Sequence, residues 1–511
     1  MPPDTSYGPI FWSDDFEQDF HGNVSNAQEN FYDVVDHLYE NEIRATALFA
    51  DRPYGTGNNS FGNFDFDPKF YPTPKKFVKN LTDYGYDFQA WVANRAFLDT
   101  ELYNTSQKNG WLFPNITATN ISGPALNLSI PEAYDYFLEK LTNFSKIGVK
   151  GFKIDRGEEL EMPDIEQNEQ MVLFEDLCYK ALEKVWGKGN FYNFARSAFD
   201  RSRSKTAVWN GDSQANFTGL QYSVASSIRA GLLGFSQWGS DTGGYLRTAT
   251  TPPEELWARW MHFSTFTPMY ELMLGTNHTP WYDYSPRLVK VLKDTADLHT
   301  QLIPYIKSYT YQATQTGLPV VRALFLEYPT DDSVYQTADE YSFGKELLVA
   351  PIVTEGGSRS VYFPQGNGKF LEYFNKTDVF SGGETHNVTD LPLEYAPVYV
   401  REGAIVPTGD LYQGNAKWSK KWKPSLNIEI YPSFNVSVST FEYYGSNGTN
   451  ATATITVTTN KPKGGLTIIY DDLGLDATAL VFTKNGTKKV DLPQGGNGAV
   501  AKLKAFESLF A

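Results

Sequence analysis

The chain has 511 residues, which is more than one compact core normally holds, so we expect a large domain followed by smaller ones. Its formal net charge of −16 disfavours a nucleic-acid partner, because phosphate backbones are bound by clustered Lys and Arg. No apolar run reaches the roughly 18 residues that a membrane-spanning helix needs, so no membrane partner is expected.

Up to about residue 275, short apolar or aromatic runs alternate with amphipathic stretches of helix length, and this alternation is typical of parallel β/α units. The longer stretches carry apolar residues at three- and four-residue spacing, as at Phe31, Val34 and Leu38. Eight such units predict a (β/α)8 TIM barrel, which with its closing helix would occupy residues 1–315. The eight apolar runs are residues 8–12, 45–50, 87–93, 149–155, 190–198, 206–212, 234–241 and 268–273.

After the eighth run the sequence predicts one helix and then a change to β structure. The amphipathic pattern continues from Pro286 to about Gln315, and we expect a single helix that closes the barrel. Short strand-like runs then alternate with turn residues, as small antiparallel β-sandwiches require. We predict a proximal C-terminal sandwich over residues 316–408 and a distal one over residues 409–511. The strand-like runs are residues 318–325, 347–351, 360–364, 391–407, 426–431, 436–444, 454–459, 465–470 and 479–483.

Several of the predicted barrel strands end in a polar or charged residue. In a (β/α)8 barrel the carboxyl ends of all strands surround one mouth, so residues far apart in the sequence would converge there. A single aspartate at such a position is as well explained by capping the next helix. Polar or charged residues recur at the ends of several predicted strands, and this recurrence favours a shared site. These residues are Asp51, Asn94, Arg95, Asp155, Arg196, Asp212 and Asp241.

Two of these carboxylates, Asp155 and Asp212, lie at the ends of separate predicted strands. Hydrolysis of a glycosidic bond requires at least two carboxyl groups. Lys153 lies two residues before Asp155, so it points to the same side of the strand and favours an ionised nucleophile. Asp212 follows Trp209 and Gly211, where partial desolvation would raise its pKa towards that of a general acid. The sequence therefore predicts a nucleophile at Asp155 and an acid/base at Asp212.

Four segments resemble glycoside hydrolase family 31 in their order and spacing. The segment at residues 152–158 resembles the nucleophile segment of that family, especially the Lys-Thr-Asp-Phe-Gly-Glu version of its α-xylosidases. The segments at residues 194–198, 209–216 and 238–245 follow as they do in the family, and the similarity extends from about Tyr7 to Pro407. The resemblance implies a retaining mechanism with Asp155 as nucleophile and Asp212 as acid/base.

The resemblance also implies roles around the two carboxylates. Asp51 matches the aspartate that holds hydroxyls of the sugar in the −1 subsite, and Arg196 matches another contact to the sugar. Trp91 would be an aromatic wall of the pocket, and Lys153 fits the lysine of the α-xylosidases. Two further residues belong to the predicted substrate site: Trp209, beside the acid/base, and Asp241, behind the residues that touch the sugar.

Three departures from the family pattern stand out. Arg52-Pro53 replaces the usual Cys-Phe, so Arg52 either addresses an unusual polar group of the substrate or pairs with a nearby acid. The family's pocket histidine has no clear counterpart near Glu271, and His278 is either its replacement or an ordinary loop histidine. The family's N-terminal β-sandwich is absent from these residues. We favour a processed precursor whose separate N-terminal fragment remains bound, over a divergent member without that domain.

These features predict an exo-acting α-glycosidase for oligosaccharides or glycosides that end in an α-linked xylose, glucose or galactose. The same chemistry permits an α-transglycosylase of the same family as an alternative, because a sugar can replace water as acceptor. A non-catalytic carbohydrate-binding homologue is a further alternative, although such a protein would be expected to have lost a carboxylate. The six His are scattered without ligand spacing, so no metal and no other cofactor is expected.

Sixteen Asn-x-Ser/Thr sequons predict a secreted, extracellular, N-glycosylated protein; the alternative is coincidence in a chain rich in Asn and Thr. The single cysteine, Cys178, excludes an intrachain disulfide and is expected to be a small buried apolar residue.

Overall fold

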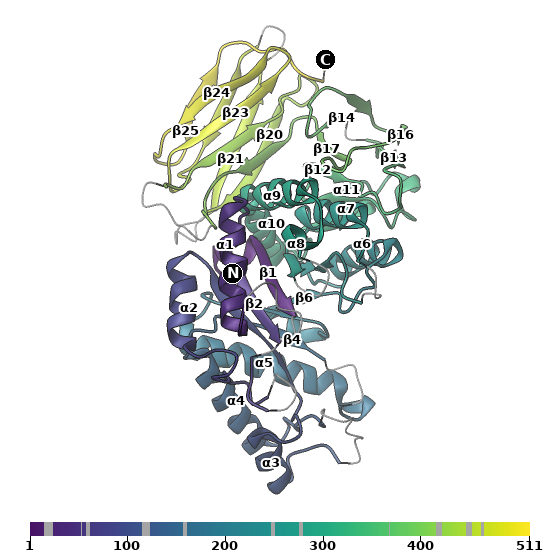
Figure 1. The fold of residues 1–511 in the computed structure, drawn as a ribbon. Coiled ribbons are helices and arrows are strands. Elements are labelled where there is room, and N and C mark those ends of the chain that lie inside the picture. The colour runs from purple at the N-terminus through teal and green to yellow at the C-terminus, as the bar shows by residue number, and fades with distance from the viewer. Residues whose placement is uncertain are drawn as a thin grey trace.

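A closed parallel barrel forms the first part of the protein (Figure 1). The computed structural model describes residues 1–14, 24–52, 54–57, 62–114, 123–156, 161–246, 251–274, 279–366, 368–414, 422–445, 452–460 and 464–510. The sheet has the order β7-β6-β5-β4-β3-β2-β1-β9-β8. Only Ser240 separates β7 from β8, and these two strands pair with β6 and β9, so one interrupted strand closes the sheet on itself. The predicted (β/α)8 barrel is therefore confirmed.

Each predicted apolar run overlaps a barrel strand, because the runs supply side chains that are buried inside the barrel or under its helices. The strands are β1 (Pro9–Asp14), β2 (Ala47–Arg52), β3 (Asp87–Ala93), β4 (Gly151–Asp155), β5 (Tyr192–Ala195), β6 (Ala207–Trp209), β7 (Trp238–Gly239), β8 (Asp241–Thr242) and β9 (Tyr270–Leu274).

The helices around the barrel follow from capping and apolar spacing. In α1, the Asn26 side chain accepts a hydrogen bond from the Glu29 N–H, and Phe31, Val34 and Leu38 form the buried face. The helices are α1 (Ala27–Glu40), α2 (Pro74–Asp83), α3 (Glu101–Lys108), α4 (Pro131–Ser145), α5 (Gln167–Trp186), α6 (Phe217–Leu232), α7 (Glu254–Thr265), α8 (Pro280–Asp283), α9 (Pro286–Gln301) and α10 (Ile303–Thr316), with 3-10 turns η1 (Asp4–Tyr7), η3 (Asp164–Glu166) and η4 (Asp200–Ser204).

The single closing helix expected between Pro286 and Gln315 is wrong. The structure has two helices, α9 and α10, which meet at Leu302. Pro304 lies in the first turn of α10, where a proline ring is tolerated, whereas in the interior of one long helix the ring would clash with the preceding turn. The apolar spacing runs through both helices, which is why periodicity alone did not reveal the break.

The C-terminal part consists of small sheets, as predicted. One six-stranded sheet has the order β10-β11-β12-β17-β14-β15, and β13 pairs with β16. Two four-stranded sheets follow, β18-β19-β23-β24 and β20-β21-β22-β25. All of these pairs are antiparallel except β19 with β23, which run parallel.

Strand β18 lies before the predicted boundary at residue 408, yet it pairs with β19, which lies after that boundary. The predicted boundary therefore divides one continuous sheet. The elements after the barrel are β10 (Val321–Ala323), α11 (Leu324–Glu327), η5 (Asp332–Val334), β11 (Tyr341–Phe343), β12 (Leu347–Val349), β13 (Arg359–Tyr362), β14 (Lys369–Glu372), β15 (Val379–Ser381), β16 (Thr385–Val388), β17 (Val398–Arg401), β18 (Ile405–Thr408), β19 (Leu426–Ile430), β20 (Val438–Tyr444), β21 (Thr452–Thr459), β22 (Leu466–Tyr470), β23 (Ala477–Thr483), β24 (Gly486–Leu492) and β25 (Ala499–Leu503).

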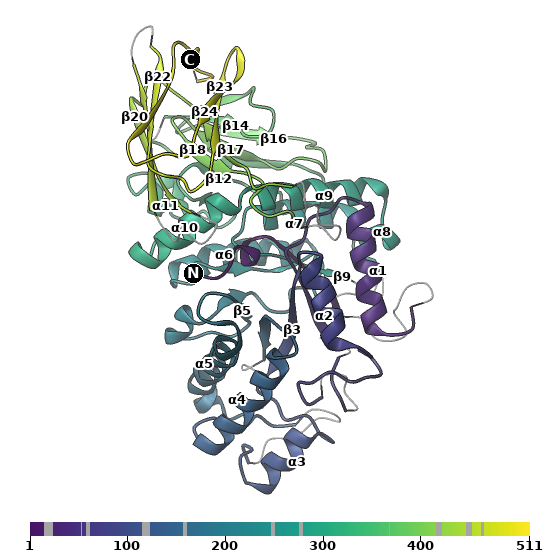
Figure 2. The ribbon, with the colours of Figure 1, turned by 90° about the vertical axis from the view of Figure 1, so that its left-hand side faces the viewer.

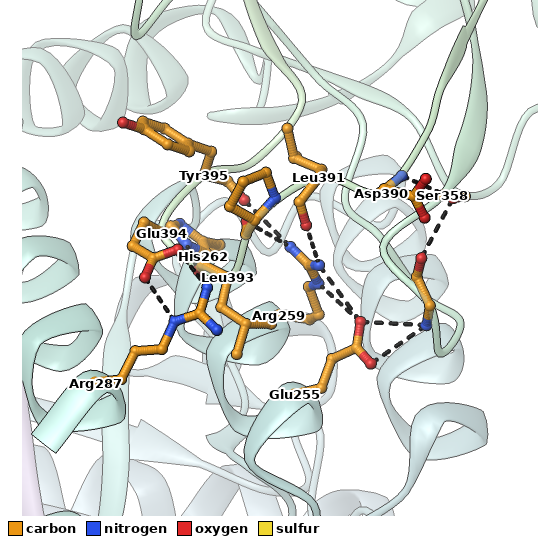
Figure 3. A network of polar contacts seen from close by, with 12 residues as sticks. Glu255, Arg259, His262, Arg287, Ser358, Asp390, Leu391, Leu393, Glu394 and Tyr395 are labelled. Atoms are coloured by element: carbon orange, nitrogen blue, oxygen red, sulfur yellow. Dashed lines mark hydrogen bonds and ion pairs between the residues drawn. The ribbon is translucent and has the colours of Figure 1, made fainter. Parts of the chain in front are cut away.

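A buried arginine joins the barrel to the C-terminal sheets. Figure 2 shows α7, α9 and α10 between the barrel strands and those sheets. In Figure 3, Arg259 of α7 donates to the carbonyls of Leu391 and Pro392, at 2.6 and 3.2 Å, and lies 3.4 Å from the Glu255 carboxylate. Glu255 in turn accepts from the Gly356 N–H at 3.2 Å. The guanidinium thus donates to the Leu391 carbonyl and adds a second donor to the Pro392 carbonyl, which also accepts from the Tyr395 N–H at 3.1 Å.

Two further contacts secure the same loop. His262 Nε2 lies 2.8 Å from the Leu393 carbonyl, and burial lowers the pKa of His262 to about 4, so the neutral ring donates this bond. The more exposed Arg287 forms two hydrogen bonds to Glu394, at 2.7 and 2.8 Å. The loop that precedes β17 is therefore fixed against α7 and α9 by side chains of the barrel.

Arg259→Met should lower the free energy of unfolding by about 2 kcal/mol, because it removes the buried guanidinium that donates to the Leu391 carbonyl and pairs with Glu255. Urea denaturation of both proteins measures this difference. Arg287→Met is the control and should lie near wild type, because its ion pair is exposed to solvent. Equal stability of the Arg259 variant and the wild-type protein would contradict the role of this contact.

Candidate active site

A polar pocket of about 370 Å³ lies at the carboxyl ends of the barrel strands. Its walls come from the ends of β2, β3, β4 and β6 and from the loop after β8, so the topology brings together residues that are far apart in the sequence. The residues that line it are Asp51, Arg52, Trp91, Lys153, Asp155, Arg156, Trp209, Asp212 and Tyr245.

Asp155, the last residue of β4, is held in one orientation by three donors. Trp91 Nε1 donates to Oδ2 at 2.8 Å, while Arg196 Nη1 and the Arg156 N–H lie 3.0 and 2.7 Å from Oδ1. Arg156 has a φ of 71°, a left-handed conformation that costs a non-glycine residue roughly 1 kcal/mol. Backbone strain of this kind is concentrated at functional sites, and here it lies directly after Asp155.

Arg196, which directly follows β5, bridges the two carboxylates. Its Nη1 lies 3.0 Å from Asp155 Oδ1 and 3.2 Å from Asp212 Oδ1. Because one nitrogen contacts both oxygens, the sum of these distances, about 6.2 Å, is the upper limit of the separation between the oxygens. Gly211 makes room for the bridge: it has a φ of 72°, and a Cβ there would lie 2.9 Å from Arg196 Cδ.

Asp212 is partly buried, and its pKa is raised to about 6. Burial is the largest cause, and the negative charges of Asp241 and Asp155 add to it, whereas Arg196 acts in the opposite direction. Below about pH 6 this carboxyl therefore holds a proton that it can donate.

A buried lysine lies beneath the carboxylates. Lys153 Nζ is 3.0 Å from Asp241 Oδ1, and it lies over the rings of Trp12 and Trp209 at 3.9 and 4.6 Å from their centroids. Burial lowers the pKa of Lys153, but the carboxylates around it, Asp241 first, outweigh burial and hold that pKa above its ordinary value. Lys153 is therefore a fixed positive charge under the pocket.

Glu271 of β9 is a buried acidic residue beneath this site that sequence reasoning missed. It is fully buried, pairs with Asp241 in the barrel register, and places Oε2 3.9 Å from Lys153 Nζ. Burial raises the pKa of Glu271 to about 8, with Lys153 opposing and Asp241 reinforcing the shift. A glutamate inside the apolar run at residues 268–273 was the available signal, because such a residue inside a buried strand needs a partner.

The structure brings eight of the nine predicted site residues to this end of the barrel. Six of them line the pocket, Arg196 bridges the carboxylates, and Asp241 lies below in contact with Lys153. His278 lies outside the described residues. The pocket also contains three residues that the sequence analysis did not assign to the site, Arg52, Arg156 and Tyr245, and Arg52 Nη2 is 3.5 Å from the Tyr245 hydroxyl.

Within the described ranges, no cluster of three or more His, Cys, Asp or Glu side chains is arranged to hold a metal ion. None of the helices described here is long and apolar enough to cross a membrane. Cys178 is buried in α5, as expected.

Family models match most of the chain. The model of the glycosyl hydrolases family 31 TIM-barrel domain matches residues 1–310, and that of the glycosyl hydrolase family 31 C-terminal domain matches residues 317–406. A solved structure of a Flavobacterium johnsoniae dextranase of this family has a TM-score of 0.84 at 21% identity, over 99% of this chain and 71% of that one, and so has the same fold.

Three curated relatives match parts of the chain. An α-xylosidase of Emericella nidulans is 24% identical over 372 residues, covering 68% of this chain and 46% of that protein. A sulfoquinovosidase of Escherichia coli is 27% identical over 389 residues, covering 70% and 57%. A 1,6-α-glucosyltransferase of Sporosarcina globispora is 32% identical over 292 residues, covering 52% and 21%. The chain thus spans less than two thirds of the length of each of these relatives.

The raised pKa of Glu271 predicts a pH-dependent stability difference. The folded protein keeps a proton that the unfolded carboxyl releases near pH 4.5, so this group destabilises the fold increasingly as the pH rises from about 4.5 to about 8. Glu271→Gln cannot titrate, so its stability relative to wild type should rise across that window and level off above it. Thermal unfolding of both proteins at several pH values measures this, and a difference that is constant with pH would contradict it.

Proposed function

The chain belongs to glycosyl hydrolase family 31, and on that premise we propose that it is a retaining, exo-acting α-glycosidase. The observation that carries the proposal is the bridge from Arg196 to Asp155 and Asp212. It holds one oxygen of each carboxylate within about 6.2 Å of the other, and retaining enzymes keep the two carboxyl groups close, about 5–5.5 Å apart. The short separation supports direct attack by one carboxylate on the sugar.

In the first step, Asp155 attacks the anomeric carbon, and the bond from that carbon to the leaving oxygen breaks. Asp212 gives its proton to the leaving oxygen, and a covalent glycosyl-aspartate forms. In the second step, Asp212 takes a proton from water, whose oxygen displaces Asp155 from the anomeric carbon. The raised pKa of Asp212 suits both of its roles, because it is protonated before the first step and is a useful base in the second.

Action on a chain end is proposed from the resemblance to the family's α-xylosidases, and the polar pocket would hold the terminal sugar. Asp51, with its carboxylate in the pocket wall, is the proposed contact to the sugar hydroxyls, and Trp91 and Trp209 are the proposed aromatic walls. Xylose, glucose and galactose are the candidate sugars, and α-xylosidases among the relatives support the first of them.

Transglycosylation is the second candidate activity. The relatives include a 1,6-α-glucosyltransferase and an isomaltosyltransferase, and the glycosyl-aspartate can pass to a sugar acceptor as well as to water. The non-catalytic alternative has less support, because both carboxylates are present and bridged by Arg196.

Secretion with N-glycosylation is also proposed. It is supported by sequon asparagines that lie exposed in the described part of the chain: Asn104, Asn143, Asn216, Asn375, Asn387, Asn435 and Asn485. A separate N-terminal β-sandwich fragment stays a prediction from the family resemblance.

Asp212→Ala tests the proposed acid/base. For substrates with poor leaving groups, such as disaccharides, kcat/KM should fall about 10³-fold, whereas for 2,4-dinitrophenyl glycosides it should fall by no more than about tenfold, because these need little protonation. In the wild-type protein, kcat/KM for the poor leaving groups should decline as the pH rises through about 6, because Asp212 then loses its proton.

Asp155→Ala is the matched control and should abolish turnover of both substrate classes, since no intermediate can form without the nucleophile. Equal losses on both classes in the Asp212 variant would contradict its assignment as acid/base. Retained turnover in the Asp155 variant would show that Asp155 is not the nucleophile.

A further inference from the structure

A polar groove lies between the six-stranded sheet and strand β20, which packs against α10 and β18 (Figure 1). One cavity has a volume of about 1000 Å³, and a second of about 800 Å³ adjoins it, since Glu346 and Thr440 line both. These two cavities form the C-terminal groove. Arg401 and Glu402 line it on the side of the six-stranded sheet, and Asn435 lines it on the side of β20. The groove shares no lining residue with the pocket in the barrel.

Asn435 is a sequon asparagine in the wall of this groove. It is exposed, and Val436 and Ser437 complete its Asn-x-Ser signal. Its Nδ2 donates to Glu402 Oε2 at 3.3 Å, and its N–H donates to Ser433 Oγ at 3.1 Å. Because the side chain is bonded to the opposite wall, a glycan attached to Nδ2 would begin in the groove.

The groove presents groups that suit a sugar chain. Among the described residues, the buried Nε of Arg401 has no hydrogen-bond partner, and Arg401 Nη2 lies 4.0 Å from Glu346 Oε1. Ser439 and Thr440 add hydroxyls further along β20, and Val438, which is 54% exposed, adds an apolar surface for the CH faces of a sugar. A buried donor without a partner costs about 1–3 kcal/mol, so a ligand that supplies an acceptor is favoured.

Two glycines fix the walls of the groove. Gly403, in the turn between β17 and β18, has a φ of 80°, and a Cβ there would lie 2.8 Å from Val436 Cγ1. A Cβ at Gly368 would lie 1.9 Å from Glu402 Oε1. The loop that carries Asn435 therefore packs directly on the β17–β18 turn, and a preformed groove binds its ligand with little loss of backbone entropy.

Building on the proposed N-glycosylation, we propose that the glycan of Asn435 lies in the C-terminal groove and joins β20 to the six-stranded sheet. Glycosylation forms a bond from Nδ2 to the anomeric carbon of N-acetylglucosamine, releases the lipid diphosphate that carried the sugar, and removes one of the two amide protons. The remaining amide proton still donates to Glu402. Hydroxyl and acetamido oxygens of the first sugars accept from Arg401, so the glycan becomes a structural contact between the two sheets.

Protection from an endoglycosidase tests this placement. The full chain is produced in a eukaryotic host that adds high-mannose glycans, and mass spectrometry of its peptides measures the glycan at each sequon. Asn485 is the internal control, because it is an exposed sequon asparagine outside the groove. Under native conditions, endoglycosidase H should release the Asn435 glycan about tenfold more slowly than the Asn485 glycan, because release requires local opening of the groove. After denaturation the two rates should be equal. In Arg401→Met the native difference should shrink, and the Asn485 rate should stay at that of wild type.

Two variants that each remove a sequon measure the contribution to stability. Ser437→Ala removes the signal but leaves Asn435 and its bond to Glu402 in place, and Thr487→Ala does the same for the control site Asn485. In the glycosylated protein, Ser437→Ala should lower the melting temperature more than Thr487→Ala does. Without glycans, in protein produced in bacteria, both variants should unfold near wild type.

Equal native release rates at Asn435 and Asn485 would overturn the groove-bound glycan. An Asn435 without a glycan, beside other sequons that carry one, would also overturn it and would leave the proposed N-glycosylation intact. The absence of glycans from every sequon would contradict the proposed N-glycosylation itself, and this inference with it.

Discussion

One guanidinium between two carboxylates sets the geometry of the whole site. Arg196 keeps the bridged oxygens of Asp155 and Asp212 within about 6.2 Å, and a short separation of the two carboxyl groups favours the proposed attack by a carboxylate. The bridge needs a glycine at position 211, because any Cβ there would meet the arginine side chain. It also needs β5 and β6 as neighbours, which the barrel provides. Fold, backbone conformation and proposed chemistry thus depend on the same contact.

The charges below the bridge explain why the two aspartates can act differently. A barrel interior is usually filled by layers of apolar side chains, yet here Lys153, Asp241 and Glu271 lie inside it. Lys153 compensates much of this negative charge, and the aromatic rings around it exclude water. The negative charge of Asp241 still raises the pKa of Asp212, in addition to the effect of burial. Asp241 and Lys153 therefore tune the pKa of the proposed acid/base in opposite directions.

The sequence predicted the barrel well, because eight buried strands produce eight apolar runs that local composition reveals. It also located both carboxylates, since strand ends in a barrel must converge. It did not reveal the break between α9 and α10, because the apolar spacing continues across Leu302. Strands such as β16 and β24 are mostly exposed and lack an alternating apolar face, so no pattern marked them. Glu271 was missed because its partner, Lys153, lies on a distant strand.

The central claim is that a terminal α-linked sugar is released with retention of configuration. Proton NMR of the reaction with p-nitrophenyl α-xyloside, α-glucoside and α-galactoside tests it most directly, because the first anomer formed reports the number of displacements at the anomeric carbon. One of the three glycosides should be hydrolysed, and its α-anomer should appear first. Appearance of the β-anomer first, or no hydrolysis of any of the three, would contradict it.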